Sequence, residues 1–189
     1  VTHSFTDRVQ LPRLYLAWHT PAVFTPGDAS MDIAASLLTG GKNARLYRRL
    51  VYDLQIAQDV SAFQQSQGLG SIFIIMATAR PGQTLGKIQA VIDEEIDKLR
   101  VTPPDAREMT RTMNQIEANF YRGMERVGGF GGKADQLNAY YTRTGMPDFF
   151  EEDLARYRAL SAPDITSAVR RYLPKDKRVE LSILPEAKP

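Results

Sequence analysis

The sequence predicts an α+β fold, in which a single, mostly antiparallel β-sheet is covered by several helices. Three observations predict it. Apolar residues alternate along Leu14–His19, as in a strand with one buried face. A hairpin pattern follows at 57–79, and after residue 84 apolar residues recur at the three- and four-residue spacing of amphipathic helices. We expect residues 1–189 to form a single domain, because no change in composition marks a boundary.

One strand and two helices are expected at the start of the chain. Turn residues at 25–28 follow the strand and precede an apolar stretch at helical spacing, which ends at Gly40-Gly41. Leucines recur at four-residue spacing within Ala44–Leu54. This spacing predicts a second helix over that range.

The hairpin consists of residues 57–67 and 71–79, which a turn at Gly68-Leu69-Gly70 joins. The second of its strands is apolar at every position from Ile72 to Met76. Because both faces of such a strand avoid water, we expect it to be central and covered on both sides.

Two long helices are expected next. Apolar residues from Leu85 to Leu99 mark the first of them. Thr102-Pro-Pro-Asp105 has the form of an N-cap with proline at the first helical position. The helix that it opens carries a single apolar stripe, which we interpret as a core face: Met109, Met113, Ile116, Phe120 and Met124.

The remaining chain predicts two further helices and a closing strand. Glycine-rich Val127–Gly132 breaks the pattern before a helix through Leu137 and Tyr141. Ser161–Asp164 repeats the cap signature ahead of the last helix. Arg178–Leu184 reads as the final strand, and a short polar tail follows it.

Composition excludes several classes of function. Hydrophobic residues make up 43% and charged residues 24%, as in ordinary folded proteins. With 24 basic and 22 acidic residues, the chain has no basic excess, so we expect neither a nucleic-acid nor a membrane partner. The absence of cysteine excludes disulfides, thiolate metal sites and a cysteine nucleophile. The chain begins at Val1 without a signal peptide, so we expect it to be a fragment of a longer protein.

Neither histidine belongs to a pair spaced to hold a metal ion. We expect His3 to lie in a frayed end and His19 to have a hydrogen-bonded structural role. Arg45, Arg48 and Arg49 favour an interdomain salt-bridge surface over nucleic-acid binding. No Gly-x-Ser-x-Gly elbow is present. We therefore expect no metal ligand and no catalytic residue in this chain.

Two acidic clusters and one glycine-rich loop receive similarly plain interpretations. Asp93–Glu95 and Glu151–Asp153 lie on the polar sides of helix patterns, which favours solvated surface over a glycosidase pair. Gly128–Lys133 suggests a phosphate loop, but Val127 occupies the first glycine position. Ala134 stands where serine or threonine would bind magnesium. We interpret the loop as a hinge between helices.

The segment from Gly40 to Val60 resembles the signature of the non-zinc-binding domain in the pitrilysin/insulinase (M16) family of zinc peptidases. Similar segments at 70–75, 79–82 and 160–174 follow in the family's order. The residues that fall on the signature without a gap are Arg45, Leu46, Tyr47, Leu50, Ile56, Ala57 and Val60.

The resemblance implies two related α+β domains per subunit, or four in two subunits, that close around a peptide. An upstream domain would carry a His-x-x-Glu-His helix and a distant glutamate as zinc ligands, with the helix glutamate as general base. This chain would be the C-terminal half of the substrate chamber of a zinc metalloendopeptidase. The zinc and the hydrolysis of unfolded peptides would belong to the whole protein. Family resemblance also implies export to a bacterial periplasm.

In the family, this domain contributes an arginine and a tyrosine that hold the substrate, and they fall here on Val51 and Gln58. Arg49 and Tyr52 lie nearby, but using them would shift the register of the match. We therefore expect a second family subunit to supply the arginine and tyrosine. Two alternatives remain: a structural or assembly subunit of the family that has lost catalysis, and a stand-alone binding domain of unrelated function.

Overall fold

The structure, a computed structural model, describes residues 1–186, so the last residues of the polar tail lie outside it. Five strands form one sheet in the order β1-β5-β2-β4-β3, in which β1 and β5 pair in parallel and the other neighbours antiparallel. The predicted α+β class with a mostly antiparallel sheet is confirmed. The strands are β1 (Thr2–Asp7), β2 (Arg13–Thr20), β3 (Ala57–Gln65), β4 (Ser71–Ala79) and β5 (Val179–Pro185).

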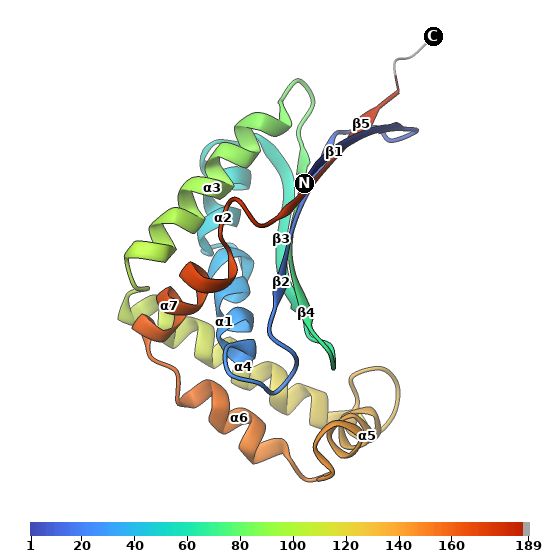
Figure 1. Cartoon of the computed structure of the whole chain (residues 1–189), viewed down its shortest axis with the longest axis vertical. Helices are drawn as coiled ribbons and strands as arrows, with labels where there is room; N and C mark the ends of the chain where they lie inside the picture. Colours follow the sequence, from blue (N-terminus) through green and yellow to red (C-terminus); the bar gives the residue numbers. More distant parts are fainter. Residues whose placement is uncertain (187–189) are drawn as a thin grey trace.

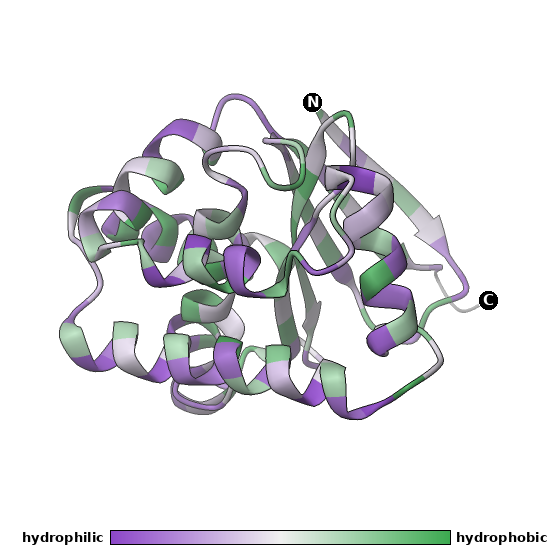
Figure 2. Ribbon diagram, turned by 90° about the horizontal axis from the view of Figure 1, so that it is seen from below, coloured by the Kyte–Doolittle hydropathy of each residue, from purple (hydrophilic) through white to green (hydrophobic). Residues whose placement is uncertain are grey.

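Helices cover one face of this sheet (Figure 1). Most of them carry both hydrophilic and hydrophobic residues (Figure 2), as expected for helices with one buried and one solvated side. The helices are α1 (Asp28–Thr39), α2 (Arg45–Tyr47), the π-helix η1 (Arg48–Asp53), α3 (Leu85–Val101), α4 (Ala106–Glu125), α5 (Lys133–Thr144), α6 (Phe150–Arg158) and α7 (Ala162–Tyr172).

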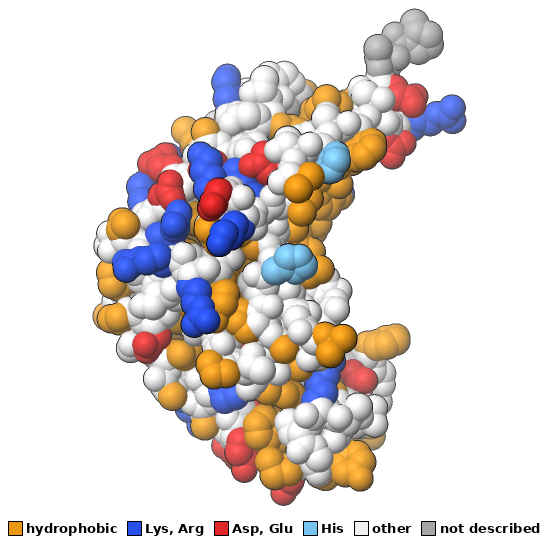
Figure 3. Space-filling view, viewed as in Figure 1, with side chains coloured by type: hydrophobic (Ala, Val, Ile, Leu, Met, Phe, Trp, Pro, Cys, Tyr) orange, Lys and Arg blue, Asp and Glu red, His pale blue; other side chains and the backbone are white. Residues whose placement is uncertain are grey.

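The opposite face of the sheet is uncovered and curves around a hollow (Figure 3). Along β4, Phe73 and Ile75 are fully buried, whereas Ile72, Ile74 and Met76 are only partly buried. The prediction that this apolar strand is covered on both sides is therefore wrong within the described residues. The strand is central, but only one of its faces is packed.

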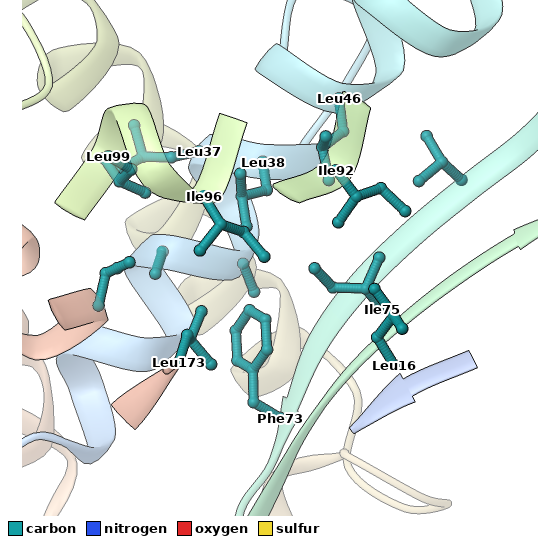
Figure 4. Packing of buried hydrophobic residues seen from close by; sticks show 14 of the residues in the cluster. Leu16, Leu37, Leu38, Leu46, Phe73, Ile75, Ile92, Ile96, Leu99 and Leu173 are labelled. Carbon is teal, nitrogen blue, oxygen red and sulfur yellow. The ribbon is translucent and has the colours of Figure 1, made fainter. Parts of the chain in front are cut away.

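The core lies between the covered face of the sheet and α1, α3 and α7 (Figure 4). Strand side chains such as Leu16, Phe73 and Ile75 interdigitate there with Ile92 and Leu99 of α3. The apolar faces predicted for the helices now seen as α1 and α3 are confirmed. The stripe predicted on α4 is confirmed in part, because Met124 does not pack against the core. The four residues of the stripe that do are Met109, Met113, Ile116 and Phe120.

The N-terminal segment is a strand, where the sequence predicted a frayed end around His3. Strand β1 pairs in parallel with β5, with Thr2 opposite Glu180 and Asp7 opposite Pro185. The α-amino group of Val1 donates a hydrogen bond of 2.9 Å to the Arg178 carbonyl. Because the partner strand lies at the far end of the chain, no local pattern in the sequence indicates this pairing.

The predicted helix over Ala44–Leu54 is present, but most of it is a π-helix. The amide of Leu54 donates to the carbonyl of Arg49, five residues earlier, at 2.9 Å. Leu46 and Leu50 are fully buried, as predicted, whereas Leu54 is 47% exposed because the wider turn rotates it away from the core. Gln55, whose backbone lies in the left-handed region with a positive φ, then connects η1 to β3.

Helix α4 begins at Ala106 and not after Thr102, so the predicted cap is displaced by three residues. Thr102 is instead the C-cap of α3, and Asp105 is the N-cap of α4. Asp105 and Glu108 form a capping box, in which each side chain accepts a hydrogen bond from the other's amide. The second predicted cap is confirmed, since Ser161 and Asp164 form a capping box at the start of α7.

Glu108 combines its capping role with an ion pair. Its carboxylate accepts two hydrogen bonds of 2.7 Å from the guanidinium of Arg45 on α2, and both side chains are largely buried. These hydrogen bonds from Arg45 keep the pKa of Glu108 below its ordinary value. The pair therefore links the start of α4 to α2.

We expect Glu108→Ala to lower the free energy of unfolding by about 2–3 kcal/mol, because it removes a cap and leaves Arg45 without its partner. Glu108→Gln keeps a capping acceptor and should cost roughly half as much. Urea unfolding followed by the fluorescence of the single, buried Trp18 measures both values. The control is Glu117→Ala, which breaks the more exposed pair with Arg158 and should cost less than about 1 kcal/mol. Equal losses for Glu108 and Glu117 would contradict this account.

Candidate functional site

The uncovered face of the sheet is mostly apolar. Alternation along the strands places side chains from three neighbouring strands on this face, and Figure 3 shows hydrophobic side chains along the hollow. Cross-strand register confirms that they are neighbours, since Ile74 lies opposite both Ala17 and Phe63. An exposed apolar surface of this kind marks a place where another molecule or domain binds. The residues are Tyr15, Ala17, Phe63, Ile72, Ile74 and Met76.

A pocket of about 450 Å³ adjoins this face where β2, β3 and β4 meet the β1–β2 loop. Arg13 and Tyr15 of β2 line it together with Gln58 of β3. The Nε of Arg13 donates to the hydroxyl of Thr78 at 3.0 Å, and that hydroxyl donates to Asp59 at 3.1 Å. Gln58 falls between the paired residues of β3, where the register to β4 shifts by a β-bulge. The polar groups on the pocket walls therefore include a guanidinium, a phenol, an amide and the carboxylates of Asp7 and Asp59.

The structure separates the two positions on which the family resemblance places substrate-holding residues. Gln58 lines the pocket, whereas Val51 packs against the core. Of their neighbours, Arg49 is held by Glu95 at 2.6 Å, and Tyr52 is 75% exposed.

The two histidines lie on different strands, and β5 separates them. His3 on β1 stacks against Phe5 with ring centroids 6.2 Å apart. His19 on β2 is exposed and has no hydrogen-bond partner among residues 1–186, so the predicted hydrogen-bonded role is wrong. Within the same residues, no three His, Cys, Asp or Glu side chains are grouped to hold a metal ion. The donor groups of this chain do not fit a zinc site.

Three of the six clustered acidic residues are largely withdrawn from water, which corrects their assignment to solvated surface. Asp93 is bound by Arg178 through two hydrogen bonds and by Lys175 at 3.0 Å. Glu95 is only 5% exposed and Asp153 only 7%. Buried carboxylates of this kind hold elements together through their cations.

The arginines of α2 and η1 also pair within the chain and not across a domain boundary. Arg45 binds Glu108, as described above. Arg48 lies 3.6 Å from Asp53, and Arg49 contacts Glu94 at 2.9 Å in addition to Glu95. Arg45 and Arg49 are thus engaged within this chain, and the interdomain salt-bridge surface stays a prediction.

The glycine-rich segment connects α4 to α5, as predicted for a hinge between helices. Gly129 and Gly131 adopt positive φ angles of 82° and 70°. A side chain at Gly132 would approach the Gly128 carbonyl to 2.5 Å, so the turn requires glycine there. Phe130 projects from the loop and is almost fully exposed.

No helix in the described part of the chain is long and apolar enough to cross a membrane.

A polar network joins α1 to α5 and α6. Arg156 of α6 lies 3.3 Å from Asp28 of α1 and 3.1 Å from Asp153. Tyr140 of α5 donates to Asp153 at 2.9 Å, and Ser66 donates to Asp28 at 2.6 Å. One guanidinium thus serves two buried carboxylates.

Asp32 lies next to this network but has no cation of its own within 4 Å among the described residues. Its carboxylate accepts a hydrogen bond of 2.7 Å from Tyr157. Burial, with a further contribution from Asp28 and Asp153, raises the pKa of Asp32 to about 7. The hydrogen bond from Tyr157 opposes this shift but does not cancel it.

This raised pKa predicts a pH dependence of stability. The folded chain binds a proton at Asp32 that the unfolded chain has already lost, so the free energy of unfolding falls as pH rises from about 4 to about 7. Asp32→Asn keeps an acceptor for Tyr157 and cannot ionise. We expect this variant to be more stable than the native chain by about 1–3 kcal/mol above pH 7, with a difference that shrinks towards pH 4. Urea unfolding across this range measures it, and a difference independent of pH would contradict it.

Arg13, Tyr15 and Asp32 carry no motif, and sequence patterns alone do not distinguish them from surface residues. Alternation along β2 does place Arg13 and Tyr15 on the face opposite Leu14 and Leu16, so their shared face is readable from the sequence. Asp32 gains its properties only in the folded chain, where it is buried and where Tyr157 of α6, more than a hundred residues away, becomes its hydrogen-bond partner.

Comparison with known proteins identifies the fold and the family. The family model described as the peptidase M16 inactive domain matches residues 3–116. No curated protein matches the sequence. Among solved structures, a protease from Helicobacter pylori has 18% identity and a TM-score of 0.86, with 97% of this chain covered and 44% of that chain.

Two further structures are similar. The inactive peptidase domain of a putative zinc protease from Bordetella parapertussis has 22% identity and a TM-score of 0.82, with 98% of this chain and 96% of that chain covered. A chain of complex III2 from Candida albicans, with Inz-5 bound, has 12% identity and a TM-score of 0.80, with 98% and 45% covered. At these identities the likeness establishes the fold. The chain spans less than half the length of the Helicobacter and Candida chains.

Proposed function

This chain belongs to the peptidase M16 family, whose inactive-domain model matches residues 3–116, and we propose that it forms the substrate-chamber half of a zinc metalloendopeptidase. An upstream domain of the same polypeptide holds the zinc, for which this chain has no fitting donor set in its described part. The whole protein hydrolyses peptide bonds, and this half closes around the peptide without performing the chemistry.

The observation that carries this proposal is the uncovered apolar face of the sheet. A sheet that buries Phe73 and Ile75 on one face and leaves Ile72 and Ile74 only partly buried on the other needs a second body to complete it. The curvature of the sheet forms a hollow and not a flat contact (Figure 3). A hollow apolar surface with a polar pocket at one end suits an extended peptide. The surface can contact apolar side chains of the peptide, and the pocket can form hydrogen bonds with its backbone.

We further propose that a second family subunit supplies the arginine and tyrosine that Val51 and Gln58 replace. Val51 packs against the core and does not line the pocket that contains Gln58. The pocket beside Gln58 retains Arg13 and Tyr15 as hydrogen-bonding groups, which we assign to contact with the peptide backbone.

A structural or assembly subunit without catalysis is the second candidate function. The likeness to a chain of complex III2 supports it, because a chain in a respiratory complex has the same fold. The two functions differ in whether the upstream domain has a working zinc site.

A peptidase assay on the full-length protein separates the candidates. We expect cleavage of an unfolded peptide only when zinc and a second family subunit are both present, because the zinc and the missing arginine and tyrosine come from different chains. Efficient cleavage by the isolated full-length monomer would refute the need for a partner. Inactivity in every mixture with zinc would favour the structural function.

The role of the uncovered face is tested by Ile74→Lys. A charge at the centre of this face should reduce the activity of the full-length protein at least about tenfold, because it must be desolvated when the halves close. The thermal midpoint of the variant should stay close to that of the native chain, because Ile74 is not part of the packed core. Val101→Lys is the matched control, since Val101 is 71% exposed at the end of α3. Equal activity of the two variants would contradict the assignment of the uncovered face to the substrate chamber.

A further inference from the structure

A second concave site lies on the helix side of the sheet, along the edge strand β3. This groove has a volume of about 580 Å³ and runs between β3, α1 and α4, with Tyr157 of α6 at one end. The edge of β3 is blocked at its middle, because the hydroxyl of Thr39 accepts from the amide of Ala62 at 2.8 Å and donates to its carbonyl at 3.3 Å. A ligand here is therefore held by side chains and not as an added strand.

The charges around the groove are unbalanced. Three carboxylates, those of Asp28, Asp32 and Asp153, face a single guanidinium, that of Arg156. Arg156 already contacts Asp28 and Asp153. Asp32, which lines the groove, is left with the hydroxyl of Tyr157 as its partner. A positive charge entering the groove would meet an uncompensated carboxylate in partly buried surroundings, where the attraction is stronger than in water.

The walls of the groove restrict which cation fits. The rings of Phe120 and Tyr157 lie edge to face, 5.3 Å apart, and provide apolar and π surfaces for an alkyl stem and its charged end. The Nε2 of Gln64 is buried and has no hydrogen-bond partner, so it is free to donate to a carbonyl oxygen. A metal ion is disfavoured, because no three ligating side chains are grouped within residues 1–186.

We propose that this groove binds the primary ammonium group of a peptide, with the Asp32 carboxylate as its counter-ion and the Gln64 amide as donor to a neighbouring peptide carbonyl. The ammonium group belongs to a lysine side chain or to the free amino terminus, which share this chemistry. That the ligand is a peptide rests on the proposed function. The ammonium site itself rests only on the groove and its charges.

Binding should be linked to the protonation of Asp32. The carboxyl holds a proton up to about pH 7 in the free chain and must release it to pair with an ammonium group. The affinity should therefore rise as pH increases through this value and level off above it. The charged groups that face Asp32 are Asp28, Asp153 and Arg156, and the titratable phenol of Tyr157 faces it as well. None of these four groups provides the carboxylate that we assign to the ammonium group.

The test uses this chain and n-butylammonium chloride, followed by two-dimensional amide NMR. We expect saturable shifts of the Gln64 side-chain amide with a dissociation constant on the order of 1 mM above pH 7. Asp32→Asn should weaken binding at least about tenfold, because it removes the counter-ion. Asp148→Asn is the matched control, since it makes the same change at an exposed position. Equal shifts with n-butanol or sodium chloride, or unchanged binding to Asp32→Asn, would overturn the proposal.

Three peptides of otherwise equal sequence then identify the source of the ammonium group. One is N-acetylated and contains a lysine, one has a free amino terminus and no lysine, and one has neither. Tighter binding of the first supports the lysine side chain, and tighter binding of the second supports the amino terminus. Equal binding of all three overturns the peptide assignment. Ammonium binding by this chain, combined with inactivity of the full-length protein in every mixture that contains zinc and a second family subunit, would refute the proposed function and leave the site intact.

Discussion

The structure depends on the burial of one face of a five-stranded sheet. Leu16 of β2 and Phe73 and Ile75 of β4 pack into α1 and α3, and each of these side chains is fully buried. Such a core has the density of an organic crystal, so the positions of α1 and α3 are tied to the pleat of these two strands. Because side chains alternate along a strand, the residues between these buried ones lie on the opposite face of the sheet, along the hollow. Packing and interaction surface are therefore two consequences of one strand pattern.

Ion pairs fix the helices to one another above this core. Arg45 joins α2 to α4, Arg49 joins η1 to α3, and Arg178 joins the start of β5 to α3. Each pair is wholly or partly withdrawn from water, so its net contribution to stability is small even though loss of one partner is costly. Their value lies in specifying which helix contacts which. Asp32 differs from all of them, because its carboxylate lies in such surroundings without a cation.

The distribution of chemical groups fits the proposal that this chain works together with another domain. In the described residues, the histidines lie on separate strands, and the buried carboxylates of Asp28, Glu95 and Asp153 are paired with arginines. The pocket beside Gln58 offers hydrogen-bonding side chains, among them Arg13 and Tyr15. What remains is a curved apolar face and two concave polar sites. These features suit a half that shapes and holds a substrate while another domain supplies the reaction. In such a division of labour, the selectivity for peptides and the hydrolysis of peptides reside in different domains.

The sequence by itself determined the fold class, the helix faces, the hairpin and the absence of cysteine chemistry, because these depend on residues a few positions apart. Leu85–Leu99 and the 57–79 hairpin are local patterns of this kind. Only the tertiary structure decided the features that need distant partners. Strand β1 pairs with β5 at the other end of the chain. Burial in the folded chain, together with the nearby carboxylates of Asp28 and Asp153, raises the pKa of Asp32 to about 7. The uncovered side of β4 belongs to the same group, because an apolar run does not reveal whether its second face is covered by its own chain or by another molecule.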